Sequence, residues 1–401
     1  MFKSQIKQCQ NCKADFIIES EDFAFYEKIS VPSPTFCYEC RTVRKMLWRN
    51  ERTLYKRKCD APRHNEDIVS IYHKERKLTV YDQKYWWSDE WDSMKYGRDY
   101  DWDKPFFEQW RELRDIFPLM SLSNSNAVNS DFCNVSDRSK DSYLASASYE
   151  IENVMYSNRI AFDKDSMDLY IGKKSELCYE NIICWDSYKL FYSRNSNNCL
   201  NSYFLFDCRN CQNCFGCVNL RNKSYNIFNK QYTKEEYEKK IKEIDLGSFK
   251  NILKFKSEFE KIYEKAIHKY ANINKSVNVT GDNLINSKNS FYSYDIDGIE
   301  NSKFIQWGVG KVNDVYDSGP GIGDVMELCY EVFDSGIGSS RLYFTSVVYG
   351  SYNVAYSFNC YNSSNLFGCI GLRNKQYCIL NKQYTEEEYE KLLPKIIRHM
   401  G

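Results

Sequence analysis

The sequence predicts a mainly β protein, in which an N-terminal zinc-ribbon or treble-clef-like module precedes a right-handed parallel β-helix (β-solenoid) in two copies with helical insertions. Three observations predict this fold. Two Cys-x2-Cys pairs lie near the start of the chain, short Asn/Asp-Ser units with apolar residues recur from about residue 129, and a long segment returns at a fixed offset. Regularly spaced short strands are typical of β structure, and recurrence at such spacing indicates stacked repeats.

The first observation is the pairing of Cys9-x2-Cys12 with Cys37-x2-Cys40, with residues 13–36 between them. Each pair offers two thiolates to one tetrahedral ion, and four soft sulfur ligands favour Zn²⁺. A segment of this length is also too short to build a core without a staple. The sequence therefore predicts one structural Zn²⁺ ion, held by Cys9, Cys12, Cys37 and Cys40, with no coordination position left for catalysis.

The stretch CQNCKADFIIESEDFAFYEKISVPSPTFCYECRTVRK resembles a zinc-ribbon module. It contains a CxxC pair with Phe16 shortly after it, an acidic and aromatic middle with Tyr26, and a Pro-x2-Cys-x2-Cys-Arg end with Pro34 and Arg41. Modules of this kind are generally treated as elements that bind nucleic acid or protein. The resemblance implies the zinc ligands and a binding role, but it does not name the partner.

A basic segment, RTVRKMLWRNERTLYKRK (41–58), directly follows the module and interleaves Lys and Arg with two aromatic residues. This mixture is typical of surfaces that contact phosphates and stack bases, so it predicts a site for RNA or DNA. The candidate nucleic-acid-binding residues are Arg41, Arg44, Lys45, Trp48, Arg49, Arg52, Tyr55, Lys56, Arg57 and Lys58. Two alternatives stay open: the apolar members pack on the module while the charges are solvated, or the acidic segment 82–103 neutralises the basic one.

The segment 59–120 is expected to extend the N-terminal domain. In CDAPRH, Cys59 and His64 are interpreted as part of a turn with an incidental His, because four better-spaced thiolates are already present. Residues 105–113 have helical periodicity that stops at Pro118. The tryptophans expected to lie mostly in the core are Trp86, Trp87, Trp91 and Trp102.

The second and third observations concern the repeats. Units such as DSYLAS at 141, DSYKLFY at 186 and NSYFLF at 201 recur, and Ser, Cys and Asn can stack at the corners of a parallel β-helix. The segment NCFGCVNLRNKSYNIFNKQYTKEEYEK (213–239) returns as NLFGCIGLRNKQYCILNKQYTEEEYEK (365–391), with 20 identities in 27 positions. Each copy ends in a helix that opens with a capping box, Thr233-x2-Glu236 and Thr385-x2-Glu388. Residues 248–270 predict one more amphipathic helix.

These patterns predict six parts. They are the zinc ribbon with its basic segment (1–58), the aromatic α+β extension (59–120), the first β-solenoid copy (121–232), a helical insertion (233–272), the second copy (273–384) and a C-terminal helix (385–401). The layout resembles a bacterial family, without an assigned activity, that joins such a zinc module to a β-helical region. Some relatives carry CoA-transferase labels, for which no residue here offers support.

The stretch CRNCQNCFGC (208–217) has the spacing of an iron–sulfur site. The internal duplication argues against that chemistry: Cys208 and Cys217 correspond to cysteines, whereas Cys211 corresponds to Ser363 and Cys214 to Leu366. Leu cannot bind a metal, yet it fits where Cys is a small buried apolar residue. Buried cysteines are therefore predicted here, with an iron–sulfur site as the alternative.

Composition and motifs bound the function. Acidic and basic residues number 55 each, so charge-driven binding needs a local patch, and the sequence lacks HExxH, GxSxG and P-loop motifs. No signal-like or membrane-spanning apolar run is visible, which predicts a cytoplasmic protein with reduced thiols. A non-enzymatic zinc-binding scaffold is predicted, with a protein partner along the solenoid as a further possibility. The alternative is a β-helical protein that binds or cleaves carbohydrate, using Asp163, Asp165, Asp168, Asp295 and Asp297.

Overall fold

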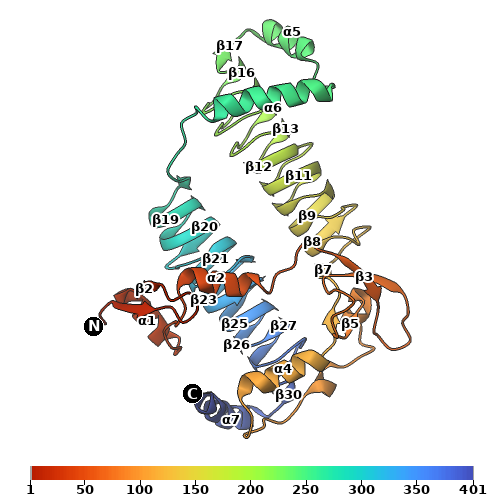
Figure 1. The fold of residues 1–401 in the computed structure, drawn as a ribbon, viewed down its shortest axis with the longest axis vertical. Coiled ribbons are helices and arrows are strands. Elements are labelled where there is room, and N and C mark those ends of the chain that lie inside the picture. The colour runs from red at the N-terminus through yellow and green to blue at the C-terminus, as the bar shows by residue number, and fades with distance from the viewer. Residues whose placement is uncertain (1, 401) are drawn as a thin grey trace. The chain divides into compact units, whose positions relative to one another are not determined.

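The computed structural model describes residues 2–400. It divides into two compact units: unit 1 comprises the chain up to Asn50, 77–119 and the chain from Tyr270 onward, and unit 2 comprises 51–76 and 120–269. Strands account for 42% of the chain and helices for 20%, so the predicted mainly β class is confirmed. Figure 1 shows the elements of both units.

Unit 2 begins with an antiparallel hairpin, continues as a series of parallel strands and ends in two helices. Its elements are β3 (Tyr55–Lys58), β4 (Asp67–Ser70), β7 (Asn124–Ser125), β8 (Asn134–Lys140), β9 (Ser146–Met155), β10 (Asn158–Ala161), β11 (Lys164–Lys173), β12 (Tyr179–Trp185), β13 (Tyr188–Phe191), β14 (Leu200–Tyr203), β15 (Gln212–Phe215), β16 (Ser224–Ile227), β17 (Lys230–Gln231), α5 (Lys234–Ile244) and α6 (Phe249–Tyr263). The strand β6 (Leu119–Met120) lies where the chain passes from unit 1 to unit 2.

Unit 1 combines the cysteine-rich N-terminus, an aromatic helical segment and a second parallel series. Its elements are β1 (Gln5–Gln8), β2 (Asp15–Ile18), α1 (Ser20–Lys28), α2 (Tyr38–Met46), β5 (Val80–Tyr81), α3 (Gln83–Trp87), η1 (Ser93–Tyr96), α4 (Phe106–Ile116), β18 (Ile273–Asn274), β19 (Val277–Ile285), β20 (Lys288–Glu300), β21 (Gln306–Tyr316), β22 (Ile322–Gly323), β23 (Met326–Phe333), β24 (Ser335–Gly336), β25 (Ser339–Tyr349), β26 (Tyr352–Ala355), β27 (Phe358–Tyr361), β28 (Ser364–Phe367), β29 (Gln376–Ile379), β30 (Lys382–Gln383) and α7 (Glu386–His399). The predicted helix at 105–113 is confirmed as α4.

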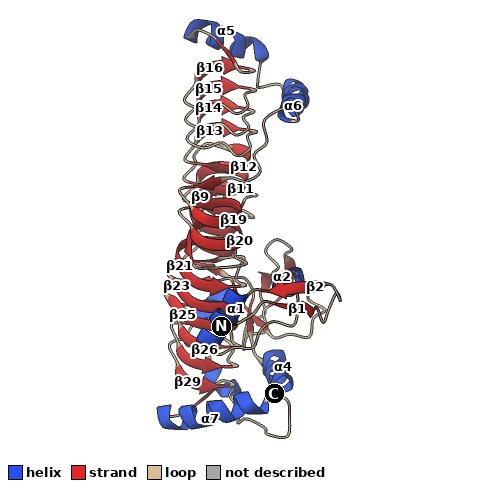
Figure 2. Ribbon diagram, turned by 90° about the vertical axis from the view of Figure 1, so that its left-hand side faces the viewer, coloured by secondary structure: helices blue, strands red, loops and turns tan. Residues whose placement is uncertain are grey.

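The parallel strands of unit 2 pair at a constant offset of 12 residues. Tyr188 pairs with Leu200, Leu200 with Gln212, and Gln212 with Ser224. Figure 2 shows β13, β14, β15 and β16 stacked one above another, with α6 beside them. Each strand therefore hydrogen-bonds to the strand of the next 12-residue repeat.

Within each repeat, every third side chain points into the core. Each residue at this three-residue spacing from 187 to 217 is buried: Ser187, Leu190, Ser193, Ser196, Cys199, Ser202, Leu205, Cys208, Cys211, Cys214 and Cys217. A residue with positive φ precedes each inward residue over much of this region, for example Asn195, Asn198 and Asn201. Such residues interrupt the two-residue alternation of a strand, and Asn tolerates this conformation better than most side chains. The inward side chains of this series therefore follow a period of three, in place of the two-residue alternation of an ordinary strand.

Inward hydroxyl groups and thiols link successive repeats. The N–H of Cys199 donates to Ser187 Oγ at 3.2 Å, and the N–H of Cys208 donates to Ser196 Oγ at 3.2 Å. Cys208 Sγ also lies within donating distance of the Cys217 carbonyl, at 3.5 Å, in the next repeat. Ser and Cys are therefore interchangeable in this core, which confirms that the cysteines of 208–217 are buried core residues.

One inward position carries a carboxylate instead. Asp163 is fully buried and lies 12 and 24 residues before Ser175 and Ser187, which occupy the same place in the next two repeats. Its Oδ1 accepts the Ser175 N–H at 2.7 Å, and its Oδ2 accepts the Ala161 N–H at 3.1 Å. Desolvation outweighs these two bonds and raises the pKa of Asp163 to about 7. Asp163, one of the carboxylates considered for carbohydrate chemistry, therefore lies in the core and not at the surface.

Replacing Asp163 with Ser is expected to stabilise the protein at and above neutral pH. Because the pKa of Asp163 is higher in the folded protein than in the unfolded chain, protonation of this carboxyl stabilises the fold. This contribution is fully present below about pH 4 and is lost as the pH rises through about 7. The gain of D163S over the wild type should grow across this window, to at most about 4 kcal/mol. Urea denaturation at several pH values measures it. The control is D165N, at an exposed position two residues away, which should show no such gain. A stability difference between D163S and the wild type that does not change with pH would contradict the prediction.

The parallel series of unit 1 departs from the 12-residue register around its glycine-rich segment. Tyr294 pairs with Gln306, but Gly308 pairs with Ile322, two residues further on. Five strands, β21, β22, β24, β25 and β23, form a closed ring of parallel pairings. The register of 12 resumes where Ser340 pairs with Tyr352.

The two copies of the internal repeat have the same local structure. The strands β15, β16 and β17 and the helix α5 begin 152 residues before β28, β29, β30 and α7, respectively. Both predicted capping boxes are confirmed, with Thr233 and Thr385 accepting the N–H groups of Glu236 and Glu388. The packing contact is also repeated, since Tyr225–Tyr237 and Tyr377–Tyr389 each have ring centroids 5.8 Å apart.

The predicted amphipathic helix at 248–270 is present as α6, which ends earlier than predicted, at Tyr263. Its Phe255 and Phe259 pack on Phe215 and Phe204 of the unit 2 stack, at centroid distances of 5.1 and 5.9 Å. The ion pair between Lys256 and Glu180 fastens the same helix further along the stack. The helix therefore covers one side of the last repeats of unit 2.

Candidate metal centre

The first cysteine pair lies in the turn between β1 and β2, which pair as an antiparallel hairpin. The N–H of Cys9 donates to the Ala14 carbonyl at 2.9 Å, and the N–H of Lys13 donates to the Cys9 carbonyl at 3.0 Å. Lys13 has φ of 65°, which turns the chain back toward β2. This tight loop directs Cys9 and Cys12 toward the same point.

The second pair lies at the start of α2. Cys37 is the N-cap residue of this helix, and Cys40 is in its first turn. The two pairs are held together by backbone, since the N–H of Gln10 donates to the Thr35 carbonyl at 3.0 Å. A hairpin turn and a helix N-terminus thus present two cysteines each to a common site.

The four sulfur atoms of Cys9, Cys12, Cys37 and Cys40 lie within 4.8 Å of one another. The separation between Cys12 Sγ and Cys37 Sγ is 3.7 Å. A tetrahedral ion with Zn–S bonds of about 2.3 Å requires sulfur atoms roughly 3.8 Å apart, so this spacing fits such an ion. Cys9 and Cys37 are buried, while Cys12 is exposed. The group can hold a metal ion.

Hydrogen bonds from nitrogen favour the thiolate form needed for a ligand. The Cys37 N–H donates to Cys9 Sγ at 3.3 Å, and Asn11 Nδ2 donates to Cys40 Sγ at 3.3 Å. Desolvation opposes ionisation of Cys9, but the backbone N–H groups of Cys37, Cys12 and Asn11 outweigh it and lower the pKa of Cys9 to about 6. Desolvation is the largest of the causes that raise the pKa of Cys37 to about 12.

The helices around this site are anchored to the strands of unit 1 by buried ion pairs. Arg41 Nε lies 3.0 Å from Asp317 Oδ1, and Lys303 Nζ lies 2.8 Å from Asp22 Oδ1, with all four side chains almost fully buried. Figure 1 shows α2 beside β21 and β23. The ring of Phe25 in α1 stacks on Tyr316 at a centroid distance of 3.9 Å. The cysteine module is therefore fixed to the second strand series by both charge and packing.

Three of the predicted nucleic-acid-binding residues, Arg41, Lys45 and Arg57, are buried. Lys45 Nζ donates to the Asp317 carbonyl at 2.5 Å, and desolvation lowers the pKa of Lys45 to about 8. Arg57 pairs with Asp60 at 2.7 Å. These three side chains are therefore not presented to a phosphate backbone.

The other predicted residues lie nearer the surface. Arg44 pairs with Glu331, Lys58 pairs with Asp67, and Arg49 lies over the ring of Trp307 and donates to the Pro320 carbonyl. Trp48 is 46% exposed and contacts Trp110 edge-on. The residues that complete the predicted set are Arg52 and Lys56, which are exposed, and Tyr55, which is half-buried. Nucleic-acid binding through this remainder stays a prediction.

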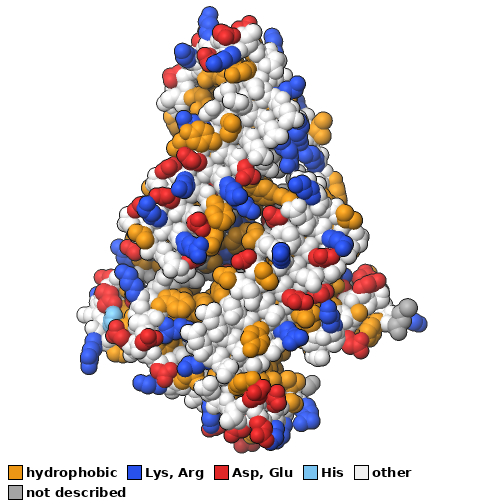
Figure 3. Space-filling view, turned by 180° about the vertical axis from the view of Figure 1, so that it is seen from behind, with side chains coloured by type: hydrophobic (Ala, Val, Ile, Leu, Met, Phe, Trp, Pro, Cys, Tyr) orange, Lys and Arg blue, Asp and Glu red, His pale blue; other side chains and the backbone are white. Residues whose placement is uncertain are grey.

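The acidic segment 82–103 does not supply the acidic residues that contact the first part of the basic segment, residues 41–45. Arg41, Arg44 and Lys45 contact Asp317 and Glu331 instead, more than 270 residues away in sequence. One signal in the sequence could have indicated burial, because residues 41 and 45 share one face of a helix. Figure 3 shows acidic and basic side chains interspersed on the face that it views.

The cysteines at 208–217 do not form a ligand group of this kind. Among residues 2–400, the groups of three or more potential ligands that lie close together are the four N-terminal cysteines and Cys59, His64 and Glu66. The structure thus brings Cys59 and His64 together, although the sequence indicated only a turn with an incidental His. The N–H of His64 does close that turn on the Ala61 carbonyl, at 3.1 Å.

The carboxylates considered for carbohydrate chemistry lie in ladders of hydrogen bonds. Asp165 accepts from Asn153, Asp295 from Asn283 and Asp297 from Asn286. A groove of about 660 Å³ contains Asp165 with Tyr179, Phe191 and Tyr203. The rings of Phe191 and Tyr203 stack on each other at 4.7 Å, so no sugar ring fits between them. Carbohydrate binding stays an alternative prediction.

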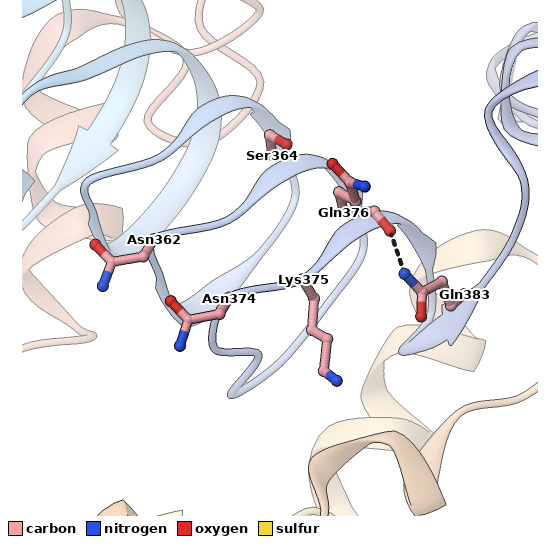
Figure 4. A pocket seen from close by; sticks show the side chains of 6 residues that line it. All are labelled: Asn362, Ser364, Asn374, Lys375, Gln376 and Gln383. Atoms are coloured by element: carbon pink, nitrogen blue, oxygen red, sulfur yellow. Dashed lines mark hydrogen bonds between the residues drawn. The ribbon is translucent and has the colours of Figure 1, made fainter.

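A polar depression lies on the last repeats of unit 1. Figure 4 shows its lining side chains, with Gln383 Nε2 donating to the Gln376 carbonyl at 3.2 Å. The lining residues are Asn362, Ser364, Asn374, Lys375, Gln376 and Gln383. The first copy repeats this bond, from Gln231 to Ser224. The recurrence shows a shared folding contact of the terminal turn.

Comparisons with known proteins do not name a relative. No family model matches the chain, and no curated protein matches it. One solved structure with similarity is titled "putative acetyltransferase", from Desulfovibrio desulfuricans G20, with 13% identity, a TM-score of 0.14, and alignment over 58% of this chain and 63% of that one. That TM-score carries no argument about fold or activity. Within the described residues, no helix is both long and apolar enough to cross a membrane. The resemblance to a bacterial family therefore stays a prediction, and the residues themselves identify a four-cysteine group able to hold a metal ion.

Proposed function

We propose that this chain is a non-enzymatic binding or scaffold protein whose N-terminal module is a zinc-ribbon or treble-clef-like fold stapled by one structural Zn²⁺ ion. The observation that carries the proposal is the convergence of four sulfur atoms within 4.8 Å, from one hairpin turn and one helix N-terminus. Four thiolates fill the tetrahedral shell of Zn²⁺ and leave no position for a substrate, which supports a structural role.

The ion would act as a cross-link, and the residues around it determine what the cross-link stabilises. Cys37 and Cys40 hold the first turn of α2, and the next residue, Arg41, enters the buried ion pair with Asp317. Closing the loop from Cys12 to Cys37 therefore also orders the helix that anchors the module.

We also propose that both parallel series are right-handed β-solenoids. In unit 2 the constant register of 12 residues and the three-residue period of inward side chains support four short faces in each repeat. The closed pairing ring of unit 1 is compatible with this geometry. Strand β21 pairs through Gly308 with β22 and through Val312 with β23, as a strand does when it bends around a corner. A protein partner along this surface, and RNA or DNA at the exposed part of 41–58, remain predictions within this proposal.

Metal analysis of the purified, untagged chain tests the zinc proposal. The wild type should contain one equivalent of Zn²⁺ more than C12S, because loss of one thiolate from a four-sulfur shell weakens binding strongly. The matched control is C211S, since the corresponding residue of the second copy is Ser363, and this variant should keep its Zn²⁺. A Zn²⁺ content of C12S equal to that of the wild type would refute the four-cysteine site. Iron and sulfide that are lost in C211S would establish the iron–sulfur alternative instead.

A further inference from the structure

We propose that the loop between β3 and β4 binds a second metal ion, of the Zn²⁺ class, through Cys59, His64 and Glu66. One ligand atom from each of these side chains lies within 4.8 Å of the other two. This is the same closeness that the four N-terminal cysteines have. The site lies in unit 2, whereas the four-cysteine site lies in unit 1.

The hairpin builds the site from its backbone. The strands pair through Lys58 and Asp67, and the N–H of Cys59 donates to the Glu66 carbonyl at 3.1 Å, which places these two residues opposite each other. Between them, Arg63 has φ of 68° and the His64 N–H donates to the Ala61 carbonyl. The chain therefore turns back sharply, and His64 returns to the side of the loop where Cys59 and Glu66 lie.

The side chains are already oriented toward one another. His64 Nδ1 lies 2.6 Å from Glu66 Oε1, and the Asn65 N–H donates to Glu66 Oε2 at 3.0 Å. The nearby cation Arg57 is engaged by Asp60 at 2.7 Å, so its charge is compensated within the loop. An ion would replace the hydrogen bond between His64 and Glu66 with two bonds to metal, and a proton would leave Cys59 Sγ.

The ligand set determines the class of metal. One thiolate, one imidazole and one carboxylate suit Zn²⁺ or Co²⁺, and they disfavour Mg²⁺ and Ca²⁺, which take oxygen ligands. Three protein ligands leave a coordination position for water or for a group from a partner. Cys59 is buried, while the Glu66 side chain is 48% exposed, so the ion would be reached from solvent.

Metal titration of the untagged full-length chain tests this site, with Co²⁺ spectra and Zn²⁺ stoichiometry as readouts. The wild type should bind two equivalents, and H64A and C59S should each bind one. H73A is the matched control, because His73 lies in the same unit outside the ligand group, and it should keep both. C12S should lose the four-thiolate Co²⁺ spectrum and keep the weaker spectrum of the single-thiolate site, which separates this proposal from the zinc module.

Two outcomes would overturn the second site. One is a single equivalent bound by the wild type. The other is a stoichiometry of two that H64A leaves unchanged. H64A is informative even where the buried C59S variant fails to fold, because the His64 side chain is 29% exposed and its removal leaves the β3–β4 hairpin bonds in place.

Discussion

Replacing Asp317 with Ala is expected to destabilise unit 1 by about 3–5 kcal/mol. The Asp317 side chain is fully buried, and the Arg41 guanidinium that it pairs with is 3% exposed. Removing the carboxylate leaves Arg41 buried without its counter-charge, beside the buried ammonium of Lys45. Chemical denaturation with a probe in unit 1, such as tryptophan fluorescence, measures the loss.

Two comparisons separate lost charge from lost packing at this position. Asp314 lies three residues before Asp317 in the sequence and pairs with Lys28, which is half exposed. The variant D314N, which removes this partner, should cost less than about 1 kcal/mol of stability. The double variant R41M/D317A no longer buries an unpaired guanidinium, so it should be more stable than D317A alone. Equal stability of D317A and D314N would mean that the buried ion pair does not anchor the cysteine module.

Replacing Trp86 with Ala should also cost about 3–5 kcal/mol, because it empties the largest fully buried side chain of the protein. The indole Nε1 donates to the Pro118 carbonyl at 3.0 Å, and the ring meets Trp87 and Tyr361 edge-on. The substitution therefore leaves both a cavity and an unsatisfied carbonyl. Denaturation midpoints of the wild type and W86A give the comparison.

The same segment provides the control for this prediction. Trp102 is 46% exposed, and its ring contacts Tyr100 and His399 near the surface. The variant W102A is expected to lose about 1 kcal/mol or less, in line with surface substitutions generally. A loss for W86A no larger than that for W102A would contradict the assignment of Trp86 to the core.

Local signals in the sequence predicted local structure well. The spacing of the cysteine pairs indicated the four-sulfur group, and the capping boxes placed the starts of α5 and α7. The duplication showed that Cys214 occupies a core position, because Leu366 has the same place in the second copy. Each of these inferences depends on residues close together in sequence, or on direct comparison of two segments.

The rest depended on contacts between residues far apart in sequence and on a local period other than that of an ordinary strand. The basic segment looks like an exposed surface because its partner Asp317 is 276 residues away. The burial of Asp163 follows from the period of three, which the two-residue alternation of an ordinary strand does not predict. Counting Ser, Cys and Leu at every third position from 187 to 217 would have revealed that period. The expected tryptophan core was only partly confirmed, since Trp86 is buried whereas Trp87 and Trp102 remain partly exposed.

Each copy of the repeat also carries its own barrier against polymerisation. A parallel series ends in a strand edge that can template another chain, as edges do in fibrils. Here the edges of β16 and β29 pair with the short antiparallel strands β17 and β30, and the chain then turns into α5 and α7. Deleting these short strands is therefore expected to expose an edge that can pair with another chain. The sequence that the two copies share includes these strands and the helices that follow them.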